Sequence, residues 1–481
     1  MIWPTVPPGV QFIEEACSGL NYYTQFTCRT LLSTEEAKAI TSKGELFLAV
    51  MKKTSNMAES YLNHLSNFTG FNLQSVETCL DDFSIIHWHL EEAKMCSTSE
   101  DLEEVWKNVR IYEADCRDST GKSDFSPLMN ENYFFVAGYI ASSLLKDMKV
   151  QSWLHQYFGK GNISEADLVV SQDGTGDVKT IMEAIERAPD NRKTPFIIRL
   201  KAGVYKEYVL IPSEKSNVRL VGEGRSSTII TGNRYHTLEI STFKSATMIV
   251  QGKGFTAKDL TIQNTAGPAN YQAVAVSVQA ENVAFYRCKF SGYQDTIYYH
   301  SGKQFYRECI IEGTIDFIFG FGNALFQKCL ILVKKPMANQ VNIISADGRK
   351  TLRTITGLSI QSCTMGATAD INWLKTSMHS TFLGRPWREY STTAFIHCYL
   401  GRIINPEGWL EWDNKGIFGS TEYVEYGNSG VGAAVQGRIS WEGYRNNILS
   451  KDVKIYSARN FINGEDWLPH TGFPYDLDVD S

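Results

Sequence analysis

The hydrophobic positions in the first third of the chain follow a helical period. Apolar residues recur there at steps of three or four, as on the buried face of an amphipathic helix. Two such series are Met57, Tyr61 and Leu65, and Leu102, Val105, Val109 and Tyr112. Short polar breaks separate the segments, which is typical of antiparallel helices. We therefore predict an all-α four-helix bundle over residues 1–152, followed by a polar linker over 153–165.

From residue 166 the pattern changes to short runs rich in β-branched residues. Examples are Phe196-Ile-Ile-Arg-Leu200, Val218-Arg-Leu-Val221 and Val274-Ala-Val-Ser-Val278. Gly, Asn and Asp interrupt these runs at short intervals, and no amphipathic helix alternates with them, which argues against βαβ winding. Residues 166–481 are therefore predicted to form a second, all-β domain.

An internal repeat indicates how these strands are arranged. The segments Phe285-Tyr-Arg-Cys288, Phe305-Tyr-Arg-Glu-Cys309 and Phe326-Gln-Lys-Cys329 place their cysteines 21 and then 20 residues apart. A period near 20 with short strands in each turn predicts a right-handed parallel β-helix. The alternative is a chance similarity within a β-sandwich.

Composition and charge narrow the classes of function. No apolar run in the 481 residues reaches the ~18 needed for a membrane span. No basic tract with interleaved aromatic residues suggests nucleic acid. Residues 1–150 hold 12 basic and 21 acidic side chains, a net charge of −9, and the remainder holds 35 and 32, a net charge of +3. We therefore expect no membrane or nucleic-acid partner, and two units of complementary charge.

The ten cysteines and two glycosylation sequons favour a secreted protein. None of the cysteines forms a C-x-x-C, so a zinc ribbon is disfavoured. The sequons begin at Asn67 and Asn162, which are the candidate glycosylation sites. The first residues, MIWPTVPPGVQF, lack the basic and apolar stretches of a signal peptide.

Two acidic residues occupy equivalent positions in the repeat. Asp295 and Asp316 each lie seven residues after a cysteine and end a Gly-x-x-Asp. Equivalent positions on neighbouring coils stack ~4.8 Å apart, so the two carboxylates are predicted to lie side by side. Such a pair is unfavourable unless one acid is protonated or both are paired, which indicates a functional site or, alternatively, a calcium site. A pair with one ionised and one protonated member fits hydrolysis at an acyl or glycosyl centre, and Gln294 could donate its amide N–H to an oxyanion.

At these residues the sequence resembles the plant pectin methylesterases that carry an N-terminal inhibitor-like region. Five motif regions match in order over residues ~166–475. They are Gly203-Val-Tyr-Lys-Glu207, Gln272-Ala-Val-Ala-Val276, Tyr293-Gln-Asp-Thr296, Asp316-Phe-Ile-Phe-Gly320 and Leu383-Gly-Arg-Pro-Trp387. The helical region resembles the pectin methylesterase inhibitor bundle.

The resemblance implies a role for each site residue. Asp316 would attack the ester carbonyl, and Asp295 would protonate the departing methanol and then activate water. Gln272 and Gln294 would hold the oxyanion, and Arg385 would pair with Asp316. Trp387 would form an aromatic wall for the sugar, and Thr242 would contact the substrate. The family works without a metal or another cofactor.

The resemblance also implies partners and covalent bonds. The substrate would be methyl-esterified homogalacturonan in the plant cell wall, whose methyl esters a secreted monomer would hydrolyse. The chain's own N-terminal region or separate inhibitor proteins would be further partners. The pairs Cys17/Cys28 and Cys79/Cys116 match the two disulfides of the inhibitor family. In the β-helix we predict a disulfide between Cys309 and Cys329 from the coil spacing, with Cys329–Cys363 as the rival pairing.

The chain departs from the family pattern at three places. After Asp316-Phe-Ile-Phe-Gly320 the family usually continues with Asn or Asp and then small residues, whereas this chain has Phe321-Gly-Asn323. The family's Thr-Ala-Gln-Gly-Arg appears in this chain as Ser345-Ala-Asp-Gly-Arg349. No dibasic processing site occurs between Lys149 and Asp167, so the N-terminal region is expected to stay attached. Two rival functions remain: an inactive β-helix that only binds, and a β-helix lyase or glycosidase.

Overall fold

The chain forms two compact units, Met1–Ile163 and Ser164–Ser481. The structure is a computed structural model. It describes residues 8–17, 31–66, 81–90, 105, 107–109, 112, 137, 166–353, 356–368, 381–412 and 419–479.

The described part of the first unit is helical, as predicted. Its helices are α1 (Pro8–Cys17), α3 (Thr34–Ala39) and α4 (Lys43–Ser66), and residues 81–90 are also helical. Helix α3 begins with a capping box, in which Ser33 and Glu36 bond each other's backbone N–H. Val105, Val109 and Tyr112 of the predicted apolar series are buried. No helix among the described residues is long and apolar enough to cross a membrane.

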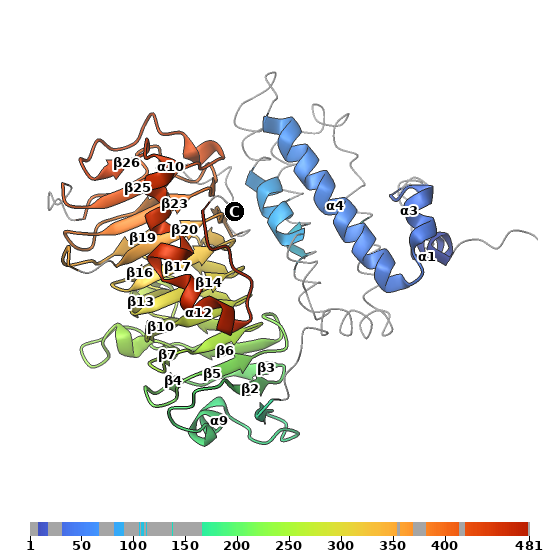
Figure 1. The fold of residues 1–481 in the computed structure, drawn as a ribbon, viewed down its shortest axis with the longest axis horizontal. Coiled ribbons are helices and arrows are strands. Elements are labelled where there is room, and N and C mark those ends of the chain that lie inside the picture. Colours follow the sequence, from blue (N-terminus) through green and yellow to red (C-terminus); the bar gives the residue numbers. More distant parts are fainter. Residues whose placement is uncertain are drawn as a thin grey trace, which may run out of the picture. The chain divides into compact units, whose positions relative to one another are not determined.

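The second unit is a stack of coils whose strands form three parallel sheets (Figure 1). Sheet A, in spatial order, consists of β1 (Leu168–Val170), β2 (Phe196–Leu200), β5 (Val218–Val221), β8 (Thr256–Lys258), β11 (Val283–Tyr286), β14 (Lys303–Arg307), β17 (Asn323–Gln327), β20 (Gly357–Gln361), β23 (Thr392–Ile396), β25 (Glu422–Tyr426) and β26 (Tyr444–Arg445). Sheet B consists of β3 (Gly203–Tyr205), β6 (Thr228–Gly232), β9 (Thr261–Asn264), β12 (Lys289–Ser291), β15 (Ile310–Gly313), β18 (Leu330–Val333), β21 (Thr364–Ala367) and β24 (Tyr399–Leu400). Sheet C consists of β4 (Val209–Ile211), β7 (Met248–Val250), β10 (Val276–Gln279), β13 (Ile297–Ser301), β16 (Ile318–Gly320), β19 (Asn342–Asp347) and β22 (Thr381–Gly384). This arrangement confirms the predicted parallel β-helix.

Aromatic side chains stack along the interior of the β-helix. Phe285, Tyr306 and Phe326 lie on successive coils, with ring centroids 5.1 and 4.3 Å apart. The strand register pairs Phe285 with Tyr306. The register therefore follows the 21-residue spacing between Cys288 and Cys309 that the sequence shows.

A left-handed residue follows the sheet A strand in six successive coils. These residues are Asp259, Arg287, Glu308, Lys328, Ser362 and His397, with φ between 51° and 56°. Each turns the chain from sheet A to sheet B. In the last five coils a buried cysteine comes next: Cys288, Cys309, Cys329, Cys363 and Cys398.

These five cysteines are free thiols, so the predicted Cys309–Cys329 disulfide and its rival Cys329–Cys363 were both wrong. The thiols of Cys309 and Cys329 instead contact carbonyl oxygens of the preceding coil, Phe285 O at 3.7 Å and Tyr306 O at 3.5 Å. Parallel stacking separates equivalent Cβ atoms by about the coil spacing of ~4.8 Å. A disulfide needs ~3.8 Å between Cβ atoms, and the prediction considered only the Cα spacing.

Short helices cover parts of the β-helix. Helix α9 (Ile181–Arg187) buries Ile181, Ala184 and Ile185 against the first coils. Near the C-terminus, α10 (Ser450–Val453), α11 (Ala458–Phe461) and α12 (Gly464–Thr471) pack on the outer face of sheet A. The 3₁₀ turns are η1 (Phe243–Ser245), η2 (Pro268–Asn270), η3 (Val431–Ala433) and η4 (Lys454–Tyr456). The outer face of sheet C carries a separate apolar cluster and the predicted site.

Candidate active site

The two predicted acids lie on neighbouring coils just before sheet C. Asp295 precedes β13 and Asp316 precedes β16, and these strands pair in parallel through Ile297 and Ile318. Both aspartates have left-handed backbones, with φ of 67° and 49°. Aspartate tolerates this conformation better than most residues. The matching turns place both carboxyl groups on the same face, as predicted from the repeat.

Glycine at the start of each turn makes room for it. A Cβ on Gly313 would clash with the Phe317 side chain, which packs back over the turn. A Cβ on Gly292 would likewise come close to Thr296, whose hydroxyl oxygen lies 2.7 Å from the Cβ position. The Gly-x-x-Asp spacing in the sequence therefore has a steric cause.

Asp316 is bound by Arg385 through two hydrogen bonds. The arginine donates from Nε to Oδ1 at 2.9 Å and from Nη2 to Oδ2 at 2.6 Å. Arg385 follows β22, and the Asp316 side chain is only 7% exposed. A two-point ion pair of this kind favours the ionised carboxylate and fixes its orientation. The ion pair with Arg385 therefore favours the anionic form of Asp316.

Asp295 has the opposite environment. Burial and the neighbouring charge of Asp316 raise the pKa of Asp295 well above its ordinary value, and Arg385 only partly opposes them. Within the described residues nothing donates a hydrogen bond to its carboxyl group. The two environments thus favour an ionised Asp316 and a protonated Asp295, the pair of states that acid-assisted acyl transfer requires.

Gln272 and Gln294 lie side by side on neighbouring coils, and Gln294 immediately precedes Asp295. They form an isolated parallel bridge, and Ala273 N donates to Gln294 O at 3.2 Å. Both side chains are partly exposed. Thr242 lies next to Phe243 at the start of η1, and the Phe243 ring meets His300 of β13 edge-on at 5.6 Å. The structure therefore brings the predicted amides and Thr242 to the same face as the acids.

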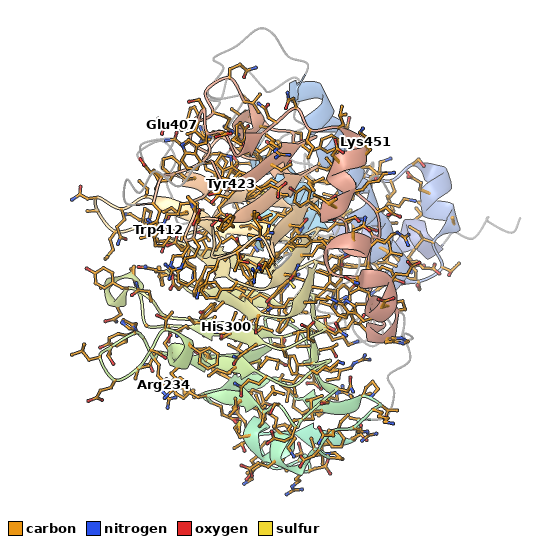
Figure 2. All side chains as sticks on the ribbon, turned by 60° about the vertical axis from the view of Figure 1, so that its left-hand side comes forward. Arg234, His300, Glu407, Trp412, Tyr423 and Lys451 are labelled. Carbon is orange, nitrogen blue, oxygen red and sulfur yellow. The ribbon has the colours of Figure 1, made fainter. Side chains whose placement is uncertain are left out.

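An aromatic strip runs along this outer face of sheet C. It consists of Phe243, Tyr298, His300, Phe319, Phe321, Trp387 and Trp412. Trp387 lies in its middle, 4.5 Å from Phe321 and 6.4 Å from Trp412 between ring centroids. In Figure 2, Arg234, His300 and Trp412 follow one another along the stack of coils. Partly exposed aromatic surfaces of this kind can bind the apolar faces of sugar rings.

Trp412 is a site residue that sequence reasoning did not assign. Its ring lies 4.1 Å from the guanidinium carbon of Arg385, the partner of Asp316. It therefore packs on the guanidinium group that binds Asp316. The Gly408-Trp-Leu-Glu-Trp412 segment marks a motif in the sequence, but only the coil stacking shows that its last residue reaches Arg385.

Two of the departures from the family pattern, Phe321 and Asp347, lie at the strip. Phe321 is part of it, in contact with Trp387. Asp347 is buried beneath it at the end of β19, and burial raises its pKa to about 7. Its carboxyl group accepts hydrogen bonds from Tyr299 Oη, Arg349 N and Thr392 N at 3.1, 3.1 and 2.8 Å.

Several predicted residues lie outside the described part of the chain. These are Cys28, Cys79, Cys116, Asn67 and Asn162. Cys17 is disulfide-bonded, but its predicted partner is among them. Among the described residues, no group of three His, Cys, Asp or Glu side chains could hold a metal ion.

Comparison with known proteins places this site in one family. The family model described as pectinesterase matches residues 167–465. A pectinesterase/pectinesterase inhibitor of Prunus persica is 45% identical over 309 residues, which cover 64% of this chain and 59% of that protein. A pectinesterase of Daucus carota is 43% identical over 311 residues, which cover 65% of this chain and 97% of that protein.

A solved structure agrees with the sequence matches. The pectin methylesterase from carrot superposes with a TM-score of 0.64 at 42% identity, covering 66% of this chain and 99% of that structure. The match thus spans the whole carrot protein but less than two thirds of the Prunus persica relative.

Proposed function

The chain belongs to the pectinesterase family, whose model covers more than half of its residues, and from that premise we propose that it hydrolyses the methyl esters of pectin to carboxylates and methanol. The observation that carries this proposal is the acid pair. Asp316 is bound by Arg385 through two hydrogen bonds, and the pKa of the adjacent Asp295 is raised. The substrate is methyl-esterified homogalacturonan.

In the first half of the reaction, Asp316 is the nucleophile. A carboxylate oxygen attacks the ester carbonyl carbon, and the carbonyl π electrons move onto its oxygen. Collapse of this tetrahedral intermediate breaks the bond to the methoxy group, and Asp295 gives its proton to the leaving methanol. The product is an acyl-enzyme, a mixed anhydride between Asp316 and the galacturonate.

In the second half, the roles of the acids follow from the charges left behind. Asp295 is now an anion and takes a proton from water, whose oxygen attacks the anhydride. The bond to Asp316 breaks, Asp316 is ionised again, and the galacturonic acid leaves and gives its carboxyl proton to the solvent. Asp295 ends protonated, so both groups have returned to their starting states.

The two glutamines supply the oxyanion site in this proposal. Gln294 immediately precedes Asp295 in the chain, and Gln272 is the backbone bridge partner of Gln294 on the preceding coil. Fixed N–H donors stabilise the charge that develops on the carbonyl oxygen in the transition state. The sugar rings lie on Trp387 and its neighbours, and Thr242 contacts the chain near Phe243.

We propose a regulatory role for the N-terminal unit. Its residues 1–150 carry a net charge of −9 against +3 for the rest of the chain. This charge opposition and the resemblance to the inhibitor bundle support a region that lowers the activity or assists folding while attached. A secreted protein acting in the cell wall fits this substrate.

Methanol release from highly esterified pectin by the full chain tests the proposal directly. We expect stoichiometric methanol and acid without a change in the length of the polymer. An unsaturated product that absorbs in the ultraviolet would indicate a lyase instead. A protein that binds pectin but releases no methanol would be an inactive binding protein, and either result would overturn the proposal.

A further inference from the structure

Resting on the proposed function, we propose that Lys334 is a positioning residue for the acid pair. Its ammonium group holds the turn that carries Gln294 and Asp295, and its backbone N–H binds the turn that carries Asp316. Lys334 follows β18, the sheet B strand of the coil after the one that carries Asp316. It acts on the reaction through the geometry of these two turns.

The turn that leads to Asp295 needs support from its surroundings. Asp295 has a left-handed backbone with φ of 67°. Outside glycine this conformation costs free energy, and it persists only where neighbouring groups fix it. In the proposed reaction Gln294 and Asp295 supply an amide donor and the proton, and they are consecutive residues, so a movement of the turn displaces both. A displacement of about 1 Å can lower turnover ~100-fold.

The ammonium group of Lys334 reaches across two coils to the start of this turn. Its Nζ donates to Ser291 Oγ at 2.7 Å and lies 4.8 Å from the centre of the Tyr293 ring. It also lies 3.4 Å from Oε2 of Glu312, on the coil between them. Ser291 and Tyr293 are the two neighbours of Gly292, where the turn begins. Lys334 therefore contacts the turn on both sides of its first residue.

Glu312 fixes the direction of the Lys334 side chain. The Glu312 side chain is 11% exposed, and its carboxylate accepts a hydrogen bond from Ser291 Oγ at 2.8 Å and pairs with Lys289 at 2.9 Å. Burial raises the pKa of Glu312, but the two lysines and Ser291 outweigh it, so the pKa lies below its ordinary value. Lys334 is therefore attached to a buried anion that is itself held by other groups.

The backbone of Lys334 binds the second turn. Its N–H donates to Gly313 O at 2.8 Å, and Gly313 begins the turn that ends at Asp316. The two turns also bind each other, because Thr314 N donates to Tyr293 O at 3.0 Å. Lys334 thus contacts the first part of both turns, and it fixes the two aspartates relative to each other.

Four variants of the full chain separate positioning from stabilisation of the fold. Lys334→Met removes the ammonium group, and Lys334→Arg restores a cation. Lys289→Met is the matched control, because Lys289 pairs with the same Glu312 carboxylate from the start of β12, before the turn begins. Tyr293→Leu removes the aromatic ring and keeps the ion pairs of Glu312.

Two measurements are made on each variant. Methanol release from fully esterified pectin gives kcat and KM. Mass spectrometry follows hydrogen exchange in the peptide that carries the amides of Gly292 and Asp295. These amides donate to Glu312 O at 3.2 Å and to Ile315 O at 3.0 Å, so their exchange reports opening of the turn.

We expect Lys334→Met and Tyr293→Leu to lower kcat by about tenfold or more, with KM within about twofold of the wild type. The turn should exchange faster in both variants. Lys334→Arg should recover most of the turnover, because it restores the cation beside Tyr293. Lys289→Met should keep the wild-type kcat and the wild-type exchange of the turn.

Three results would overturn the positioning role of Lys334. They are a wild-type kcat in Lys334→Met, an equal loss of kcat in Lys289→Met, and a raised KM at unchanged kcat, which would make Lys334 a substrate-binding residue. If Lys334→Met does not fold, the kcat and exchange of Tyr293→Leu decide the question. If the wild type releases no methanol, the proposed function fails, and the exchange comparison still decides whether Lys334 holds the turn.

Discussion

At the scale of single residues, two chemically identical side chains acquire different states. Asp295 and Asp316 have the same turn and nearly the same burial. They differ in their partners, because only Asp316 is bound through two hydrogen bonds by Arg385. The negative charge fixed on Asp316 then helps to keep Asp295 protonated. In the proposed mechanism, one arginine therefore determines which acid attacks and which donates the proton.

Asp347 should make the stability of the β-helix depend on pH. Its folded-state pKa is about 7, well above the ~3.9 of an unfolded aspartate. Between these values the folded state binds the proton and the unfolded state does not, so stability falls as pH rises from about 4 to 7 and then levels off. Asp347→Asn keeps the shape and removes this loss, on the order of a few kcal/mol at neutral pH.

Urea unfolding between pH 4.5 and 8, followed by tryptophan fluorescence, measures this effect. The stability difference between Asp347→Asn and the wild type should grow with pH up to about 7. The exposed Asp452 on α10 provides the control, because Asp452→Asn should follow the wild-type curve. Parallel curves for Asp347→Asn and the wild type would contradict the assignment.

At the scale of elements, the fold depends on a turn that repeats from coil to coil. A left-handed residue and a buried cysteine follow the sheet A strand in coil after coil. Burial raises the pKa of Cys288, Cys309, Cys329 and Cys363 well above that of a free thiol. These thiols pack as small apolar side chains and do not form reactive thiolates.

The cysteines should therefore be present as thiols and protected in the folded protein. With no reductant added, iodoacetamide should label the peptides carrying Cys309 and Cys329 only after unfolding. A sample reduced before unfolding serves as the control and should give the same labelling at these two positions. A cross-linked Cys309–Cys329 peptide, or labelling of the folded protein, would contradict the description of these cysteines as buried free thiols.

The sequence predicts those features of the β-helix that repeat with the coil. The spacing of Cys288, Cys309 and Cys329 gave the coil period, and the same spacing placed Asp295 beside Asp316. Features that depend on side-chain direction were not predictable. Stacked cysteines point in parallel and do not meet, so the predicted disulfide was wrong.

Contacts between residues that are far apart in the chain also could not be predicted from the sequence. Arg385 and Trp412 lie 69 and 96 residues after Asp316 in the chain, and only the stacking of coils brings them together. Arg385 was assigned because its motif resembles that of the family. Trp412 lies in a matching motif as well, but nothing in the sequence shows that it packs on the arginine.

At the scale of the whole molecule, the chain combines an acidic helical unit with a slightly basic β-helix. Opposite net charges attract over about a Debye length, ~10 Å at 0.1 M salt, and salt weakens this attraction. If the helical unit lowers the activity through its charge, the inhibition should be strongest at low ionic strength. In that case the difference in net charge between the two units is the cause of the inhibition.

A specific protease site inserted between residues 153 and 165 tests this role in a chain that has folded whole. After cleavage and separation of the two parts, we expect faster methanol release than from the uncut chain. The difference should be largest at low salt. Uncut protein taken through the same protease treatment without the inserted site is the control. Equal rates before and after cleavage at every salt concentration would show that the helical unit does not block the site.

The most direct test of the mechanism is methanol release by Asp316→Asn in the full chain. The amide has the size of the carboxylate but cannot form the acyl-enzyme, so turnover should fall by ~10³-fold or more. Circular dichroism should show an unchanged fold, and Asp452→Asn should keep the wild-type rate. Near-normal methanol release by a folded Asp316→Asn protein would contradict Asp316 as the nucleophile and the account built on it.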